Sequence, residues 1–195
     1  MIHHISGPEA PWGGQFIKEK NHVIIMGPVG TGKTHLSQAL GMLACQKNKK
    51  VKFIRSSELL NEFYRSRADA TYDVVFKRYS KLDVLILDDF GLKTLSANES
   101  SDLYDLIASV NINASLIITT NRKIEKWSEI FHDPVMANAA LDRVVNNAYR
   151  IVLEGESYRK KFTPKFIKSC FYIVYKIRSY KRLVNIRGYC FCNKW

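Results

Sequence analysis

The chain has 195 residues, 46% hydrophobic and 25% charged, which is ordinary for one globular domain with a buried core. It lacks both an uninterrupted apolar run of roughly 20 residues, as a membrane helix needs, and a signal-peptide pattern, so we expect a cytoplasmic protein without a membrane partner. The net charge of +12 comes almost entirely from the end of the chain, because residues 1–158 hold nineteen basic and eighteen acidic side chains.

The N-terminal segment, residues 1–21, holds two prolines and three glycines and shows no clear hydrophobic period, so we predict a loop leading into the domain. Beyond it, short apolar runs predict five buried strands. The predicted strands are His22–Met26, Val51–Arg55, Val84–Leu87, Ser115–Thr120 and Arg150–Leu153.

The segments between these runs have the 3.6-residue apolar spacing of amphipathic helices. Ser96 and Glu99 form a capping-box pattern ahead of one helix. Asp133 followed by Pro134 is typical of another helix start. Strands that alternate with helices predict an α/β fold, here a five-stranded parallel sheet with helices on both faces.

The strongest chemical signal is GPVGTGKT, which matches the P-loop pattern G-x-x-x-x-G-K-[ST] between a predicted strand and a predicted helix. Backbone N–H groups of such a loop surround phosphate oxygens, and the helix N-terminus adds a favourable dipole. We expect Lys33 to bind the β- and γ-phosphates and Thr34 to offer its hydroxyl to Mg²⁺. A glycine-rich turn with an incidental lysine is the alternative. The predicted nucleotide-binding residues of the loop are Gly27, Pro28, Val29, Gly30, Thr31, Gly32, Lys33 and Thr34.

A second signal is the apolar run LIL, which ends in Asp88 and Asp89. Ligands of open α/β sheets bind outside the carboxyl ends of the strands. We therefore expect Asp88 to hold Mg²⁺, largely through water, and Asp89 to polarise the attacking water. A solvated turn is the commoner explanation for an isolated Asp-Asp pair, but the preceding P-loop favours the catalytic one.

A third signal is the sequence TTNR at the end of the SLIITT run. From a neighbouring strand end, the side chain of Asn121 could reach the γ-phosphate or its attacking water. A plain transition from strand to loop is the alternative. Asn121 is the predicted catalytic residue of this segment.

The order of the P-loop, LILDDFGL, IITTNR and FHDPVMANAALDRVVNNAYRIVLEGESYR resembles the IstB-type ATPases over about residues 22–159. These are helper proteins of bacterial insertion-sequence transposition, related to DnaC-type helicase loaders and DnaA-type initiators. The resemblance implies a P-loop NTPase of AAA+ type that uses ATP with Mg²⁺, oligomerises on DNA without sequence specificity and assists a transposase. The choice of ATP over GTP also rests on it.

Carried over by position, Gly27–Thr34 corresponds to the Walker A motif, Asp88 and Asp89 to Walker B, and Asn121 to sensor 1. Arg143 matches the arginine-finger position of the family. The resemblance implies that this side chain reaches the nucleotide of an adjacent subunit in a homo-oligomer stacked head to tail. Without the resemblance, Arg143 would be interpreted as a helix-surface arginine that pairs with Asp142 or another nearby acid.

Two further segments carry the resemblance less specifically. Arg159, in GESYR, is the late arginine of the family. Residues 57–81 correspond to the helical insertion that contacts DNA in the initiator branch, but their charge hardly distinguishes a DNA face from a solvated helix pair.

The chain departs from the family at its ends and at one catalytic position. Asp89 stands where many AAA+ enzymes carry glutamate, so hydrolysis is expected to be slow or impaired. Only 26 residues precede Gly27, so we expect the helical N-terminal region of the family to be missing. Residues 160–195 form a basic, aromatic-rich tail, too short for a full helical lid. The tail either contacts nucleic acid or arises from a frameshift in a decaying mobile element.

The sequence thus predicts an N-terminal segment (1–21), an AAA+ ATPase domain (22–159) and the tail (160–195). The leading function is a DNA-dependent ATPase that assists the transposase of a bacterial insertion sequence. A DnaC-like helicase loader in DNA replication and an inactive truncated remnant that keeps the nucleotide-binding fold are the alternatives.

Overall fold

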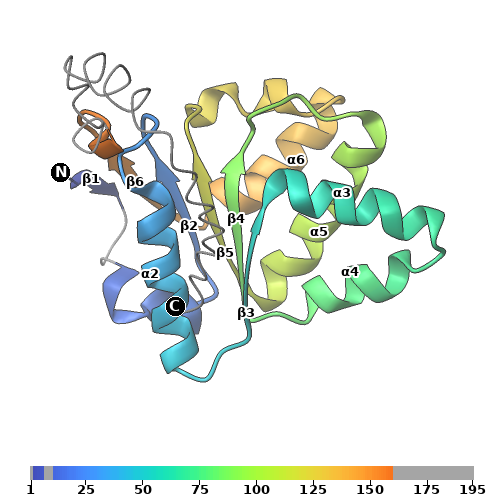
Figure 1. Ribbon diagram of the computed structural model, residues 1–195, viewed down its shortest axis with the longest axis horizontal. Helices are drawn as coiled ribbons and strands as arrows, with labels where there is room; N and C mark the ends of the chain where they lie inside the picture. The colour runs from blue at the N-terminus through green and yellow to red at the C-terminus, as the bar shows by residue number, and fades with distance from the viewer. Residues whose placement is uncertain (1, 7–10, 160–195) are drawn as a thin grey trace, which may run out of the picture. The chain divides into compact units, whose positions relative to one another are not determined.

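The computed structural model describes residues 2–6 and 11–159 and shows a six-stranded sheet in the order β1-β6-β2-β5-β4-β3 (Figure 1). Five strands are parallel, and β1 pairs with β6 in the antiparallel direction. The strands are β1 (Ile2–Ser6), β2 (His22–Met26), β3 (Val51–Arg55), β4 (Val84–Phe90), β5 (Ser115–Thr120) and β6 (Ala148–Leu153). The predicted parallel sheet of five strands is therefore confirmed.

Helices cover both faces of the sheet. In Figure 1, α2 lies on one side of the strands, whereas α3, α5 and α6 lie on the other. Neighbouring residues of one strand face opposite cores, since Val23 and Ile25 pack with α2 and Ile24 packs with the helices of the other face. The helices are η1 (Pro11–Gly13), α1 (Gln15–Lys18), α2 (Lys33–Gln46), α3 (Ser56–Ala68), α4 (Tyr72–Ser80), α5 (Ala97–Asn113), η2 (Ile124–Lys126), η3 (Ser128–Ile130) and α6 (Pro134–Val145).

The prediction of a loop over residues 1–21 is wrong. Strand β1 forms the sheet edge beside β6, and α1 buries Phe16 and Ile17 in the same core as α2. The sequence of β1, IHHIS, has no apolar alternation that would predict a strand. The segment is a strand because it pairs with β6, the last strand of the domain. The tail predicted over residues 160–195 lies outside the described residues.

Both predicted helix starts are confirmed. Glu99 N donates to Ser96 Oγ, and the Glu99 carboxylate accepts a hydrogen bond from Ser96 N, which completes the capping box of α5. Asp133 accepts a hydrogen bond from Val135 N at the start of α6, with Pro134 at the first helical position.

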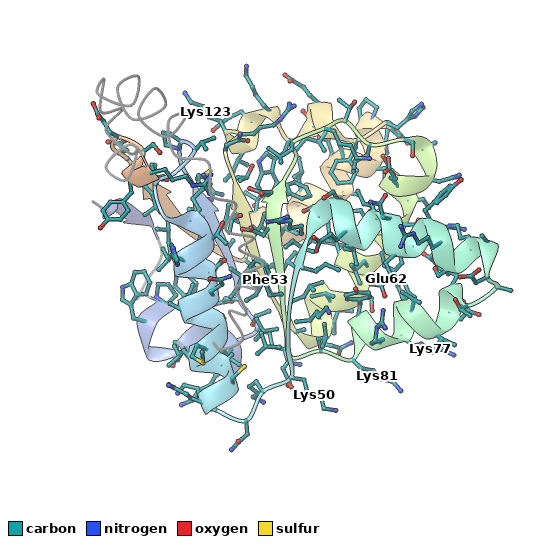
Figure 2. The ribbon with its side chains drawn as sticks, in the orientation of Figure 1. Lys50, Phe53, Glu62, Lys77, Lys81 and Lys123 are labelled. Atoms are coloured by element: carbon teal, nitrogen blue, oxygen red, sulfur yellow. The ribbon has the colours of Figure 1, made fainter. Side chains whose placement is uncertain are left out.

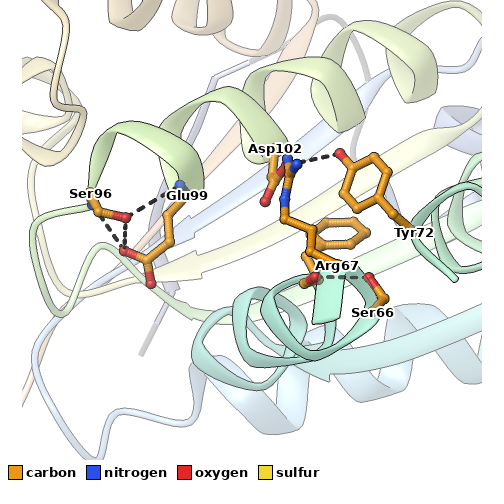
Figure 3. A network of polar contacts seen from close by, with 7 residues as sticks. Ser66, Arg67, Tyr72, Ser96, Glu99 and Asp102 are labelled. Atoms are coloured by element: carbon orange, nitrogen blue, oxygen red, sulfur yellow. Dashed lines mark hydrogen bonds and ion pairs between the residues drawn. The ribbon is translucent and has the colours of Figure 1, made fainter. Parts of the chain in front are cut away.

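Polar contacts fix the helix pair α3–α4. Arg67 on α3 and Tyr72 on α4 both donate hydrogen bonds to the buried carboxylate of Asp102 on α5 (Figure 3). Glu62 on α3 lies between the two helices and accepts hydrogen bonds from Arg78 and Tyr79 on α4 (Figure 2). The pair is therefore held to the rest of the domain and to itself by charged hydrogen bonds as well as by apolar packing.

Candidate functional site

The loop from Gly27 to Gly32 joins the central strand β2 to α2. Gly30 has a φ of +81°, and a Cβ atom at this position would lie 2.0 Å from Ser157 Oγ. A side chain at position 30 would therefore be both strained and overlapped by the segment after β6. Gly32, with a φ of +96°, precedes the first residue of α2, so free backbone N–H groups of the helix start face the end of the loop.

Lys33 is the first residue of α2, and its side chain is buried inside the loop. Its ammonium group donates hydrogen bonds to Gly27 O at 2.9 Å and to Pro28 O at 2.8 Å. Burial lowers the pKa of Lys33, while the carboxylates of Asp89 and Asp88 act in the opposite direction. The structure thus holds the Lys33 ammonium against two carbonyl oxygens of the P-loop, beside the backbone N–H groups that a phosphate would contact.

Asp88 lies at the end of β4, and its side chain points toward Thr34 on α2. The Thr34 hydroxyl lies 3.1 Å from Asp88 Oδ1 and 3.2 Å from Oδ2. This pair of oxygen ligands fits Mg²⁺, which proteins bind through one or two carboxylates together with substrate phosphates. Within the described ranges, no group of three or more His, Cys, Asp or Glu residues could hold a metal ion without such a substrate.

Asp89 follows Asp88 in a left-handed backbone conformation, with a φ of +56°. The pairing between β4 and β5 shifts register between Leu87 and Phe90, so the two acidic residues lie in a bulge. A bulge redirects side chains. Consequently, Asp88 is buried against Thr34, whereas Asp89 is exposed and lines an open cavity.

This cavity has a volume of about 620 Å³ and brings together residues from the ends of five strands, β2 to β6, or from the segments that follow them. Asn121, directly after β5, lines it together with Asp88 and Asp89. The full lining is Val29, Gly30, Thr31, Gly32, Lys33, Thr34, His35, Gln38, Arg55, Asp88, Asp89, Leu92, Asn121, Tyr158 and Arg159. The structure therefore gathers Lys33 and Thr34 of the P-loop and all three predicted strand-end residues at one site.

Arg143 does not line this cavity. It lies on α6, where its guanidinium donates a hydrogen bond to Ala139 O at 2.6 Å and lies 5.3 Å from the centre of the Tyr104 ring. In the described part of the chain Arg143 forms no ion pair with Asp142, whose carboxylate instead accepts a hydrogen bond from Asn146. Arg143 therefore does not serve the nucleotide cavity of its own chain.

Sequence reasoning assigned no role in the site to three residues that contribute to it. Tyr158 N donates a hydrogen bond to Gly30 O at 2.9 Å, which ties the GESYR segment to the P-loop. The positive charge of Arg159 is close enough to contribute to the lowered pKa of Lys33. Thr119 is buried between Asp88 and Asp89, although the TTNR motif pointed only to Asn121. These residues lie in the GESYR and TTNR motifs, which could have indicated their place in the site.

The residues of this site lie within a segment that matches a known protein family. The family described as "IstB-like ATP binding protein" matches residues 12–165. The chain belongs to this family. The IstB-like match covers the P-loop, both acidic strand-end residues, Asn121 and the GESYR segment.

Relatives with similar sequences are named as ATP-binding proteins of insertion sequences. One from Mycobacterium tuberculosis is 38% identical over 143 residues, covering 73% of this chain and 57% of that protein. The protein of IS232 from Bacillus thuringiensis subsp. berliner is 33% identical, covering 75% of this chain and 59% of that protein. This IstB-like chain therefore spans less than two thirds of the length of these relatives.

Several solved structures share the fold. DnaI matches with a TM-score of 0.64 and 20% identity over 76% of this chain and 88% of that one. The DnaC helicase loader matches with a TM-score of 0.62 and 20% identity over 76% and 94%. The fold is that of an AAA+ P-loop NTPase. None of the helices in the described residues is long and apolar enough to span a membrane.

Proposed function

We propose that this IstB-like protein binds ATP with Mg²⁺, hydrolyses it, and uses the nucleotide cycle on DNA to assist a transposase. The observation that carries the proposal is the convergence of Lys33, Thr34, Asp88 and Asp89 at one open cavity. A P-loop alone specifies phosphate binding, whereas an exposed carboxylate beside a buried one adds a candidate base for hydrolysis.

The residues divide the chemistry between them. Lys33 and the loop N–H groups would bind phosphate oxygens, and Arg159 faces the same cavity with a further positive charge. Thr34 and Asp88 would hold Mg²⁺, which supplies neutralisation of the phosphate charge when bound. Asp89 would accept the proton of the attacking water as its oxygen bonds to the γ-phosphorus and the bond to the bridging oxygen breaks. The products are ADP and phosphate.

The DNA part of the proposal is supported by the helix pair α3–α4. Two of its basic residues are engaged, Arg67 with Asp102 and Arg78 with Glu62. Arg65, Lys77 and Lys81 are exposed instead, and Figure 2 shows Lys77 and Lys81 along α4 and at its end. Exposed cations of this kind can contact phosphates without reading sequence. The transposase as partner is supported by the insertion-sequence origin of the relatives.

Substitution of Lys33 by alanine tests nucleotide binding. The affinity for ATP, measured by calorimetry, should fall at least about tenfold, because a charged hydrogen-bonding partner of the phosphates is lost. His35→Ala, two residues later in the same helix and at the cavity rim, is the matched control and should bind ATP more tightly than Lys33→Ala. Equal affinity in the unsubstituted protein and Lys33→Ala would remove the basis of the proposal.

A further inference from the structure

Thr119 lies at the end of β5, and its single hydroxyl group contacts both acidic residues of the site. It donates a hydrogen bond to Asp88 Oδ1 at 2.6 Å and accepts one from Asp89 N at 3.0 Å. We infer that Thr119 is a positioning residue that fixes Asp88 and Asp89 in their two different orientations. The inference rests on the proposed function for its catalytic meaning, but its structural part can be tested without nucleotide.

The bulge in β4 explains why a hydroxyl is needed at this position. Because the register shifts between Leu87 and Phe90, the N–H of Asp89 lacks an ordinary ladder partner on β5. The left-handed conformation of Asp89 is itself unfavourable, by about 1 kcal/mol or more for a residue other than glycine. The hydrogen bond to Thr119 Oγ1 satisfies this N–H and opposes relaxation of the bulge.

The same hydroxyl stabilises the buried carboxylate. Asp88 is 3% exposed, and a carboxylate removed from water requires hydrogen-bond donors. The Thr119 hydroxyl supplies one such donor at 2.6 Å. It leaves Asp88 turned toward Thr34 and Asp89 turned toward the cavity. One side chain thereby couples the proposed metal ligand to the proposed base.

Thr120 provides a matched control on the next residue. Its side chain is also fully buried, and its hydroxyl donates to Phe90 O at 2.9 Å and accepts from Arg122 N at 3.1 Å. Replacement of either threonine by valine removes one hydroxyl of the same size and burial at the same sheet edge. Only the Thr119 substitution removes hydrogen bonds to Asp88 and Asp89.

Amide hydrogen exchange, measured by NMR on the full chain without nucleotide, tests the structural part. In Thr119→Val the Asp89 amide should exchange about fivefold faster or more, as expected for loss of a hydrogen bond. In Thr120→Val the accelerated amide should be that of Arg122, while Thr119→Ser should keep the Asp89 amide protected. Unchanged Asp89 exchange in Thr119→Val overturns the inference. If Thr119→Val does not fold, Thr119→Ala removes the same hydroxyl without the added methyl group.

Kinetics test the consequence for catalysis. Thr119→Val should lower kcat about 10- to 100-fold and raise the Mg²⁺ concentration for half-maximal rate, as loss of a supporting contact to a metal ligand does. The KM for ATP should change much less, because the P-loop is intact. Thr119→Ser should restore the rate. If the unsubstituted chain hydrolyses ATP and Thr119→Val matches Thr120→Val, the inference fails. If the unsubstituted chain does not hydrolyse ATP, the proposed function fails and hydrogen exchange alone decides the role of Thr119.

Discussion

Asp89 combines an exposed carboxylate with a left-handed backbone conformation, and this combination makes one substitution especially informative. Asparagine tolerates the left-handed region as well as aspartate does, so Asp89→Asn changes the charge without adding strain. We expect ATP affinity to persist and kcat to fall about 100-fold or more, because the amide cannot accept the proton of water. Steady-state kinetics and calorimetry measure both. Asp142→Asn, an exposed site on α6, is the control, and unaltered turnover in Asp89→Asn would exclude Asp89 as the base.

Alanine substitutions at two P-loop glycines separate the effect of backbone strain from the effect of steric overlap. Gly30 and Gly32 both have positive φ, but only at Gly30 would a Cβ atom collide with another residue, Ser157. Both alanine substitutions should destabilise the protein by about 1 kcal/mol through backbone strain, and Gly30→Ala should cost more. Addition of Ser157→Gly should recover part of the excess for Gly30→Ala and none for Gly32→Ala. Thermal unfolding checks the order. If Gly32→Ala proves the more harmful, the close approach of the GESYR segment is not what requires glycine.

At the level of elements, the helix pair α3–α4 depends on an ionised Glu62. Burial raises the pKa of Glu62, but the hydrogen bonds from Tyr79 and Arg78 outweigh burial, and the pKa lies below its ordinary value of 4.5. A carboxylate with a lowered pKa in the folded state stabilises the protein above its unfolded-state pKa, and this contribution disappears as pH falls through the folded-state pKa.

Glu62→Gln should therefore lower the free energy of unfolding at neutral pH by on the order of 1 kcal/mol. The difference from the unsubstituted protein should vanish in acid, where Glu62 is protonated. Glu58→Gln is the control on the same helix, because its ion pair with Arg55 is exposed, at 3.8 Å, and contributes little at any pH. Denaturant unfolding at several pH values gives both comparisons. If the loss of unfolding free energy in Glu62→Gln stays constant as the pH falls, the stabilising role of the ionised Glu62 is contradicted.

Local patterns predicted most of the sheet but not its edge. The runs at His22–Met26, Val51–Arg55 and Ser115–Thr120 are strands with the predicted bounds. The first and third are buried along nearly their whole length, as central parallel strands are, whereas Val51–Arg55 lies at the sheet edge and is partly exposed. Strand β1 has no such apolar run, because its formation depends on backbone pairing with β6, which is distant in the sequence. Likewise, the P-loop and the acidic residues were predictable from spacing, whereas the role inferred for Thr119 depends on a bulge that spacing does not reveal.

At the scale of the whole molecule, the position of Arg143 predicts that activity requires assembly. The side chain lies on α6, outside the cavity of its own chain, so the proposed arginine-finger role would require the nucleotide of a neighbour in a head-to-tail stack. Arg143→Ala should bind ATP normally but hydrolyse it slowly. A mixture with Lys33→Ala should recover activity, because some interfaces then pair an intact loop with an intact arginine.

The control mixture combines Lys33→Ala with Asp89→Asn. Both changes damage the same cavity, so no interface in that mixture contains an intact site, and activity should stay low. ATP turnover in mixtures of known ratio, with co-assembly checked by light scattering, measures the effect. Co-assembled Arg143→Ala and Lys33→Ala subunits that remain inactive would show that Arg143 does not act between subunits.

The place of β6 in the sheet has a consequence for how the protein is made. The strand lies between β1 and β2, and the residues just after it cover the P-loop, so the earliest and latest parts of the domain must meet. A ribosome that adds about 5–20 residues per second takes roughly 6–25 s to pass from Thr34 to Arg159, and until then β6 and the segment after it cannot complete the sheet. The P-loop is synthesised before the GESYR segment and stays incomplete throughout this period. We therefore expect ATP to stabilise the domain only once translation has passed the GESYR segment.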